Sequence, residues 1–295
     1  MKLTSWLPYV TSRILVPLAS NRKPRRGRRS GSTQLASELL ETRALLAVIS
    51  WDGGAGTSNW GDAANWSANL SGLDELPRAS DDVLIGSEFA AVTISSGGSV
   101  SINNLTSEAS LAIVGGTFSI ANTSTVARDL SLSATLMGSG DLNVAGALHW
   151  YSGTMSGVGT TTVLAGGTLT IDDAQHILNG RTLLNQGTGE WVWNHIRLNN
   201  GAVFTNAGTL NVQSQHDMSS SGGGTFNNTG TITRTVSAGP TTIYAGVVFN
   251  NSGTLSVQSG SWYSDSGGLS SGSFDVSGGA NLTLYSHTLT GFKLF

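Results

Sequence analysis

Short runs of alternating apolar and polar residues recur through the second half of this chain at a nearly constant interval. One phrase runs from Phe through Asn, Gly and Thr to an aliphatic residue, and it occurs at residues 204–212, 226–232 and 249–257. Its phenylalanines are 22 (226 − 204) and 23 (249 − 226) residues apart. Alternation places the apolar side chains on one face of a strand. A period of this length is typical of a stacked solenoid.

Weaker copies of the phrase extend towards the N-terminus. Residues at the equivalent place are separated by 20 to 27 positions, and they are Thr117, Asp141, Thr168, Thr188, Thr209, Thr231 and Thr254. A last copy covers residues 278–284. No single coil can bury its own apolar side chains, so equivalent strands of neighbouring coils must pair in parallel. The pattern predicts an all-β fold: a right-handed parallel β-helix of about 8–10 coils of roughly 20–27 residues, with three short strands per coil.

Two columns of side chains follow from the register of the repeats. Equivalent residues of a solenoid stack over one another, so the repeated asparagines should form a hydrogen-bonded ladder along the axis, at Asn185, Asn206, Asn228 and Asn251. The repeated phenylalanines should form an inward stack of rings, at Phe204, Phe226 and Phe249. For the asparagines, a structural corner ladder is favoured because Asn suits a turn. The alternative is a polar surface that binds a ligand.

Composition and charge divide the chain. The 295 residues include no cysteine, which excludes disulfides and thiol chemistry. Residues 1–47 hold nine Lys/Arg and two Glu (+7), and residues 48–295 hold six Lys/Arg and sixteen Asp/Glu (−10), which together give −3. The acidic repeats disfavour nucleic acid as a partner. We expect three parts: a basic sorting or export segment at 1–47, a Trp-rich capping segment at 48–90, and β-helix repeats at 91–295.

The N-terminal segment carries an Arg-rich run at residues 22–29, followed by residues 40–46 (Leu-Glu-Thr-Arg-Ala-Leu-Leu). This combination resembles the LEPR-XLL sorting-type sequence of large surface or secreted proteins of planctomycete bacteria, although Thr42 stands where that family usually has Pro. The resemblance implies export through a disordered or helical segment, and a cell-surface or extracellular location. A plain amphipathic helix is the alternative. No transmembrane span is expected, because no segment has the roughly 18–20 uninterrupted apolar residues that one needs.

The next segment places Trp51, Trp60 and Trp66 within 16 residues. It is similar to the opening phrase of many autotransporter-like bacterial β-helix proteins, in which such a stretch precedes the first coils. Tryptophan side chains can cover the open end of a solenoid, where strand edges would otherwise lack partners. One alternative is a sugar-stacking platform. Another is a calcium site built from the carboxylates of this segment, which are Asp52, Asp62, Asp81 and Asp82.

The best local candidate for catalysis is the pair Asp172 and Asp173, with His176 and Arg181 following. Paired carboxylates act as acid and base in glycoside hydrolysis. However, adjacent residues of a strand point to opposite faces, and no second Asp lies one coil away. We therefore expect a solvated corner and assign no catalytic residue. No metal or cofactor is expected either, because the histidines lack a metal-binding spacing; they are His149, His176, His195, His216 and His287.

Aromatic residues concentrate in the middle coils, at Trp150, Tyr151, Trp191 and Trp193. Alternation puts Trp191 and Trp193 on one face, which is either part of the core or a carbohydrate-stacking patch on the surface. These four residues are the candidate ligand contacts.

The function that these features favour is an extracellular or cell-surface structural or adhesive β-solenoid without catalytic activity. Its expected partners are an extracellular polysaccharide or other surface proteins. The alternative is a carbohydrate-binding or polysaccharide-degrading β-helix protein that uses the central aromatic residues, or Asp172, Asp173 and Arg181.

Overall fold

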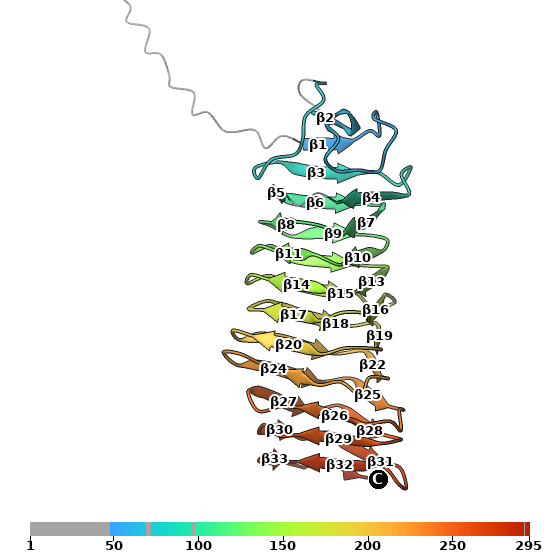
Figure 1. Ribbon diagram of the computed structural model, residues 1–295, viewed down its shortest axis with the longest axis vertical. Coiled ribbons are helices and arrows are strands. Elements are labelled where there is room, and N and C mark those ends of the chain that lie inside the picture. The colour runs from blue at the N-terminus through green and yellow to red at the C-terminus, as the bar shows by residue number, and fades with distance from the viewer. Residues whose placement is uncertain (1–47, 69–71, 96–97, 292) are drawn as a thin grey trace, which may run out of the picture. The chain divides into compact units, whose positions relative to one another are not determined.

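The computed structural model describes residues 48–68, 72–95, 98–291 and 293–295. This part of the chain is a stack of coils, in which nearly all strands pair in parallel with the equivalent strand of the next coil (Figure 1). Each coil contributes one strand to each of three sheets, which we call sheets A, B and C in chain order. The predicted all-β parallel β-helix is therefore confirmed, and sheet C counts ten strands, one for each complete coil described.

The strands are short and follow one another around the coil. Sheet A contains β1 (Val48–Trp51), β2 (Trp66–Ala68), β3 (Asp82–Ile85), β6 (Asn104–Ser107), β9 (Ser124–Val126), β12 (Leu142–Val144), β15 (Thr160–Val163), β18 (Thr182–Asn185), β21 (Ala202–Asn206), β24 (Gly224–Asn228), β27 (Val247–Asn251), β30 (Gly268–Ser270) and β33 (His287–Leu289). Sheet B contains β4 (Ala91–Ile94), β7 (Ser110–Ile113), β10 (Leu130–Leu132), β13 (Ala147–Trp150), β16 (Thr168–Ile171), β19 (Thr188–Trp191), β22 (Thr209–Val212), β25 (Thr231–Arg234), β28 (Thr254–Val257), β31 (Ser273–Val276) and β34 (Lys293–Leu294). Sheet C contains β5 (Ser99–Ile102), β8 (Thr117–Ile120), β11 (Thr135–Met137), β14 (Gly153–Ser156), β17 (His176–Asn179), β20 (Ile196–Asn199), β23 (Met218–Ser219), β26 (Pro240–Ile243), β29 (Ser261–Ser264) and β32 (Asn281–Leu284).

The coils are shorter than the sequence pattern predicted. Residues in register in sheet B are separated by as few as 18 (148 − 130) and as many as 23 (255 − 232) positions. The expected steps of 24 (141 − 117) and 27 (168 − 141) residues joined positions on different sheets, because Thr117 lies in sheet C, Asp141 directly precedes a strand of sheet A, and Thr168 lies in sheet B. The same short alternating motif occurs on more than one face of a coil, so it cannot by itself tell the three faces apart.

The inside of the stack is filled by side chains from alternate positions of all three sheets. Phe204, Phe226 and Phe249 lie in register in β21, β24 and β27 and are fully buried. Their ring centroids are 5.1 and 5.4 Å apart, with interplanar angles of 23° and 33°. The structure thus places the three rings in one inward column, where each aromatic pair contributes about 0.5–1.5 kcal/mol beyond its buried area.

A buried ladder of asparagines runs along the corner between sheets A and B. Each of the four is the last residue of its strand in sheet A, and all are buried: Asn185, Asn206, Asn228 and Asn251. The side-chain amide of each of the first three donates to the side-chain oxygen of the next, at 2.9, 3.0 and 2.7 Å. The same three amides also donate to the carbonyl oxygens of Thr209, Thr231 and Thr254. Their burial leaves no surface for a ligand, so this column serves the corner itself.

The glycine two residues after each of these asparagines permits a close approach of successive coils. A Cβ atom on Gly230 would collide with the carbonyl oxygen of Gly208, and one on Gly253 would collide with that of Gly230. This contact explains why Asn-x-Gly-Thr recurs in the phrase. Asparagine supplies the donors of the corner, and glycine allows the next coil to lie directly on it.

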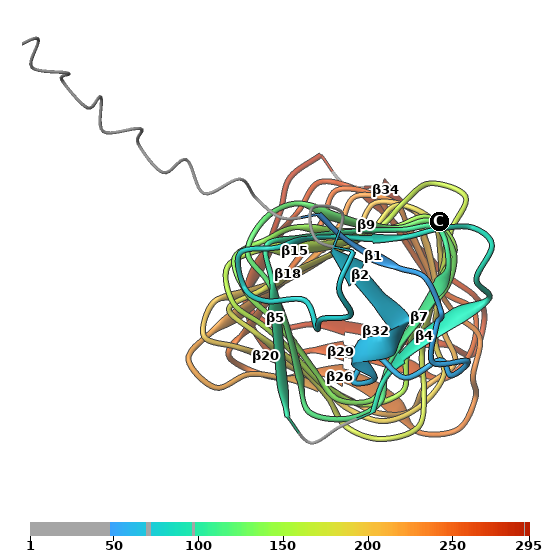
Figure 2. The same ribbon diagram turned by 90° about the horizontal axis from the view of Figure 1, so that it is seen from above.

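The Trp-rich segment covers the first coil. Seen from above, β1 and β2 cross the opening of the stack (Figure 2). Trp51, Trp60 and Trp66 are buried, with ring centroids 4.8 Å apart for Trp51–Trp66 and 4.5 Å for Trp60–Trp66. The backbone at Trp60 also exchanges hydrogen bonds with the edge strand β4, since its amide donates to Thr93. Because these rings are buried, they are not available to stack on a sugar.

The carboxylates considered for calcium are bonded within the chain. Asp52 accepts from the amide of Gly54, at 2.9 Å, and Asp62 from the side chains of Thr57 and Asn59. Asp81 accepts from the amide of Arg78, at 2.7 Å, and Asp82 accepts from the side chains of Asn103 and Asn104. Over the described residues, no group of three or more His, Asp or Glu side chains is arranged to hold a metal ion.

The basic run at 22–29 and the motif at 40–46 lie outside the described residues. In the part of the chain that is described, no helix is long and apolar enough to cross a membrane.

Candidate functional site at the corner between sheets B and C

The four aromatic residues of the middle coils do not form one patch. Trp150 and Trp191 end β13 and β19, in register with Ile171 and Val212, and their side chains are buried. The prediction that they are ligand contacts is therefore wrong. The strand carries them inward, and they are part of the core.

Trp193 is exposed, and the prediction that it shares a face with Trp191 is also wrong. The strand β19 ends at Trp191, and the amides of both Val192 and Trp193 then donate to the carbonyl of Ile171. Asn194 follows with φ 65°. This turn breaks the alternation, so Trp193 points outward with 47% of its surface exposed.

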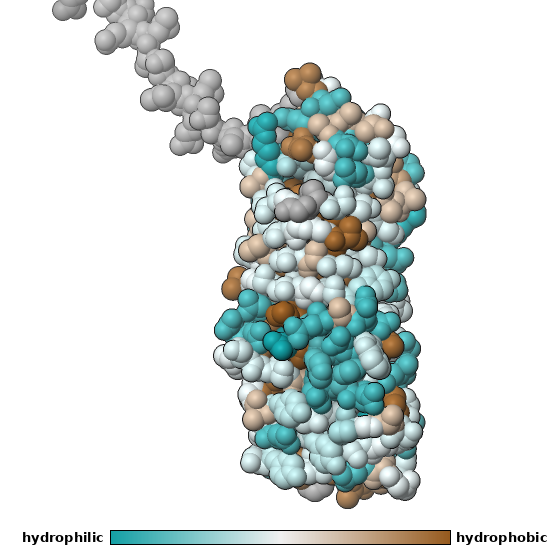
Figure 3. Space-filling model, in the orientation of Figure 1, coloured by the Kyte–Doolittle hydropathy of each residue, from teal (hydrophilic) through white to brown (hydrophobic). Residues whose placement is uncertain are grey.

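Two of the predicted contacts remain on the surface, on two different coils. Tyr151 is 39% exposed, and its ring is stacked on that of His149 at 5.8 Å and 12°. The ring of Trp193 meets His216 edge-on at 4.5 Å, and His216 in turn lies 4.9 Å from His195. We call Trp193, His195, His216 and Asp217 the corner cluster. Hydrophilic residues gather over these middle coils in the space-filling view (Figure 3).

The corner cluster contains two histidines and one carboxylate. Nδ1 of His195 lies 3.7 Å from a carboxylate oxygen of Asp217 and accepts a hydrogen bond from the Asp217 amide at 3.2 Å. The other carboxylate oxygen accepts from the amide of Thr242 in the next coil. Burial and the nearby His195 lower the pKa of His216, against a smaller opposing effect of Asp217. One oxygen of the carboxylate is thus held by a backbone amide of the next coil, and the cluster stabilises a turn.

The pair Asp172 and Asp173 lies on the same corner. Asp172 accepts a hydrogen bond from the amide of Asp173, which is exposed at φ 80°. Both neighbours that would assist catalysis are fully buried: His176 donates inward to the carbonyl of Trp150, at 2.8 Å, and Arg181 lies inside the stack. No substrate on the surface reaches these two side chains.

Two buried arginines are a feature that the repeat pattern did not predict. The guanidinium of Arg181 donates to Thr161 Oγ1 at 2.8 Å and to the carbonyl of Gly140 at 2.9 Å, with longer bonds to three further carbonyls. Burial lowers the pKa of Arg181 to about 10, partly offset by Asp141, so it stays protonated at neutral pH. Arg234 is held in the same way, by Thr241 and by loop carbonyls that include Ser259.

A sequence signal for Arg234 did exist. It stands where Val212 and Val257 stand in the neighbouring copies of the phrase, which is an inward position. Arg181 precedes its strand and has no equivalent in the phrase, so only the packed coils show where it lies.

Several carboxylates bind the backbone of the following coil. Asp129 accepts from the amide of Ala147 at 2.9 Å, Asp141 from that of Thr160 at 2.7 Å, and Asp217 from that of Thr242 at 3.2 Å. A buried or half-buried amide without an acceptor is costly, so these bonds support the stack. The three carboxylates lie at different corners, because they directly precede β10 of sheet B, β12 of sheet A and β23 of sheet C.

The buried His176 makes stability depend on pH. Nε2 faces two carbonyl oxygens and must carry the proton, whereas buried Nδ1 has no partner. Burial lowers the pKa of His176 below 6.5, with backbone bonds opposing that shift. The unfolded chain therefore binds a proton more readily, so this contribution to stability is complete above pH 6.5 and is lost as the pH falls below it.

We expect urea midpoints measured at pH 7.5 and pH 5 to fall with acid, and to fall less in His176→Gln, which keeps a donor for the Trp150 carbonyl. An equal acid effect in wild type and variant would show that His176 does not carry it.

Comparison with known proteins finds no family model, no curated protein and no solved structure that matches this chain.

Proposed function

We propose that this chain is a non-catalytic structural or adhesive β-solenoid. It acts as a stiff spacer and displays polar side chains on its outer faces. One observation carries the proposal. The charged side chains that an enzyme would direct at a substrate are bonded within the stack: Arg181 and Arg234 are buried, and Asp129, Asp141 and Asp217 hold the backbone of the next coil. Thr, Ser and Asn are frequent on the outer faces of the strands.

The proposal places the protein at the cell surface or outside the cell. Its support is the resemblance of residues 40–46, behind the Arg-rich run, to a LEPR-XLL sorting-type sequence, and that of the Trp-rich segment to autotransporter-like β-helix proteins. An extracellular solenoid of this kind would have polysaccharides or other surface proteins as partners.

The test incubates the full chain with neutral and acidic polysaccharides and follows polymer length by size-exclusion chromatography, with calcium and with a chelator. We expect every polymer to keep its length. Shortening of any of them would overturn the proposal in favour of a polysaccharide-degrading enzyme, and would direct mutagenesis to Asp172 and Asp173. The location is tested by adding protease to intact cells that produce the chain. Digestion there is expected, and protection alongside a cytoplasmic marker would contradict it.

A further inference from the structure

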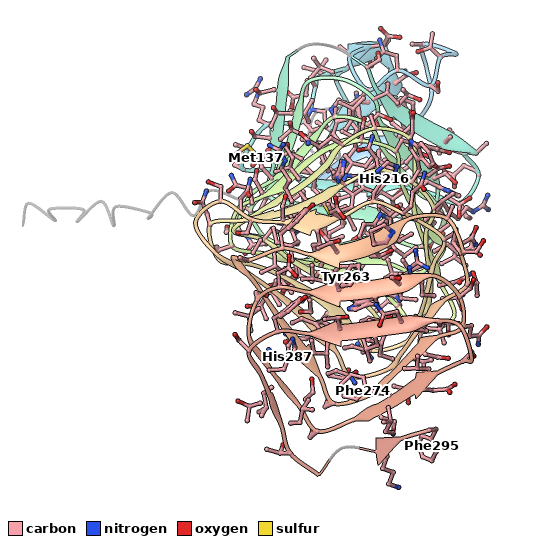
Figure 4. All side chains as sticks on the ribbon, turned by 60° about the horizontal axis from the view of Figure 1, so that its bottom comes forward. Met137, His216, Tyr263, Phe274, His287 and Phe295 are labelled. Atoms are coloured by element: carbon pink, nitrogen blue, oxygen red, sulfur yellow. The ribbon has the colours of Figure 1, made fainter. Side chains whose placement is uncertain are left out.

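Three of the four tyrosines in the described residues lie close together on one side of the stack. Of the four in the described residues, Tyr151 lies on the middle coils, and the other three lie on the outside of sheet C in three successive coils. Tyr244 directly follows β26 and is 45% exposed, Tyr263 lies within β29 and is half-buried, and Tyr285 directly follows β32 and is 55% exposed. Figure 4 shows Tyr263 among the strands of these last coils. We call the three residues the tyrosine face.

The tyrosine face follows the axis of the stack. The amides of Tyr244, Asp265 and Tyr285 each donate to the preceding coil, to Met218, Ile243 and Ser264 respectively. These bonds place Tyr244, Asp265 and Tyr285 one above another. Since neighbouring strands lie about 4.8 Å apart, Tyr244 and Tyr285 are separated by about 10 Å along the axis.

Tyr263 lies beside this column, on the coil between the other two tyrosines. It is in register with Thr242 and Thr283, which flank it on the neighbouring strands. Outward side chains of a sheet stand roughly perpendicular to it, so the three rings and Thr283 share one surface, whereas Thr242 is buried. Trp262 and Ile243 are buried on the inner side of the same strands, which gives this surface a rigid support.

The composition of the tyrosine face suits a carbohydrate. A tyrosine ring offers an apolar surface to a pyranose and a hydroxyl for hydrogen bonding. Around the rings are the hydroxyl of Thr283, the amide of Asn281 and the carboxylate of Asp265. The large aliphatic side chains that are exposed in these coils lie on the other two sheets: Val248, Leu269 and Leu289 on sheet A, and Leu294 on sheet B. The tyrosine face therefore combines aromatic rings with polar side chains and carries no exposed aliphatic one.

Charge selects the class of carbohydrate. Asp265 lies in the column between Tyr244 and Tyr285, and residues 48–295 carry a net charge of −10. An anionic polymer would be repelled, whereas the carboxylate can accept hydrogen bonds from the hydroxyls of a neutral one. We propose that the tyrosine face binds a neutral polysaccharide, with the polymer chain lying along the axis of the stack over Tyr244, Tyr263 and Tyr285.

The corner cluster fits such a polymer less well. Trp193 is its single tryptophan or tyrosine ring, and His216 meets this ring edge-on. It lies on a turn with positive φ at Asn194 and is accompanied by Asp217, and by Asp172 and Asp173 of the preceding coil. A lone ring on a curved, acidic turn offers no continuous surface to an extended chain.

The proposal names a ligand for the adhesive role and so rests on the proposed function. The experiment measures depletion of the full chain by cellulose and chitin as neutral probes, and by immobilised polygalacturonate as an acidic one. The double variant Tyr244→Ala/Tyr285→Ala is compared with Trp193→Ala, which removes a ring of similar exposure elsewhere. Unchanged melting temperatures show that both variants are folded, as expected for substitutions at exposed positions.

We expect a neutral probe to bind the wild type and Trp193→Ala equally, and the double variant about tenfold more weakly, as expected from the loss of two stacking rings. Wild-type affinity in the double variant, binding to the acidic probe alone, or no binding to any probe would overturn the proposal. Loss of binding in Trp193→Ala alone would place the contact at the corner cluster, against the proposal. Shortened polymer or an intracellular location would instead count against the proposed function. The depletion of the double variant, compared with that of the wild type, tests the tyrosine face independently of those two results.

Discussion

Replacing Arg181 with leucine is expected to lower the free energy of unfolding by about 3 kcal/mol, because buried acceptors that lose their only donor each cost about 1–3 kcal/mol. The guanidinium donates to Thr161 Oγ1 and to the carbonyl oxygens of Gly138 and Gly140 inside the stack. Leucine fills much of the space and removes a buried charge, which offsets part of the loss. Urea unfolding followed by circular dichroism measures the difference.

The matched control is Arg197→Leu, because Arg197 lies on the outside of sheet C, one coil away, and is exposed. A change within about 0.5 kcal/mol is expected there. Arg181→Lys should fall between the two, since an ammonium group reaches fewer of the acceptors than the planar guanidinium. If Arg181→Leu were as stable as the wild type, the guanidinium would not be what satisfies these carbonyls.

Replacing Asn228 with alanine is expected to cost about 2–4 kcal/mol, because the side chain lies in the middle of the buried ladder. It accepts from Asn206 at 3.0 Å and donates to Asn251 at 2.7 Å and to the carbonyl of Thr254 at 2.9 Å. Alanine leaves these partners in a buried corner, and each unsatisfied group costs about 1–3 kcal/mol. The same urea titration measures the loss.

Asn227 provides the control one residue away. Its side chain lies on the outer face of sheet A, accepts from Asn250 at 2.9 Å, and is half-buried beside a surface groove. Water can replace that bond, so Asn227→Ala should cost less than about 1 kcal/mol. Equal losses at 227 and 228 would mean that both effects come from the strand and that the ladder contributes nothing of its own.

The candidate surface sites were harder to predict than the columns, and Trp193 shows why. Alternation holds only while a strand continues, and β19 ends two residues before Trp193. Trp150 and Trp191, which do lie within strands, could have been assigned to the core by comparison with Ile171 and Val212 in register with them. The turns between strands vary in length and carry positive φ angles, and they decide which aromatic residues reach the surface.

The sequence by itself determined the parallel β-helix and the positions of the asparagine and phenylalanine columns. The reason is physical: each coil of a solenoid stacks on the preceding one, so residues at equivalent positions of successive sequence repeats come into contact in the folded chain. Only the tertiary structure decided the burial of Arg181 and the grouping of Tyr244, Tyr263 and Tyr285. None of these residues belongs to the repeated phrase, and their places depend on how far each coil's corners carry the chain before the next strand begins.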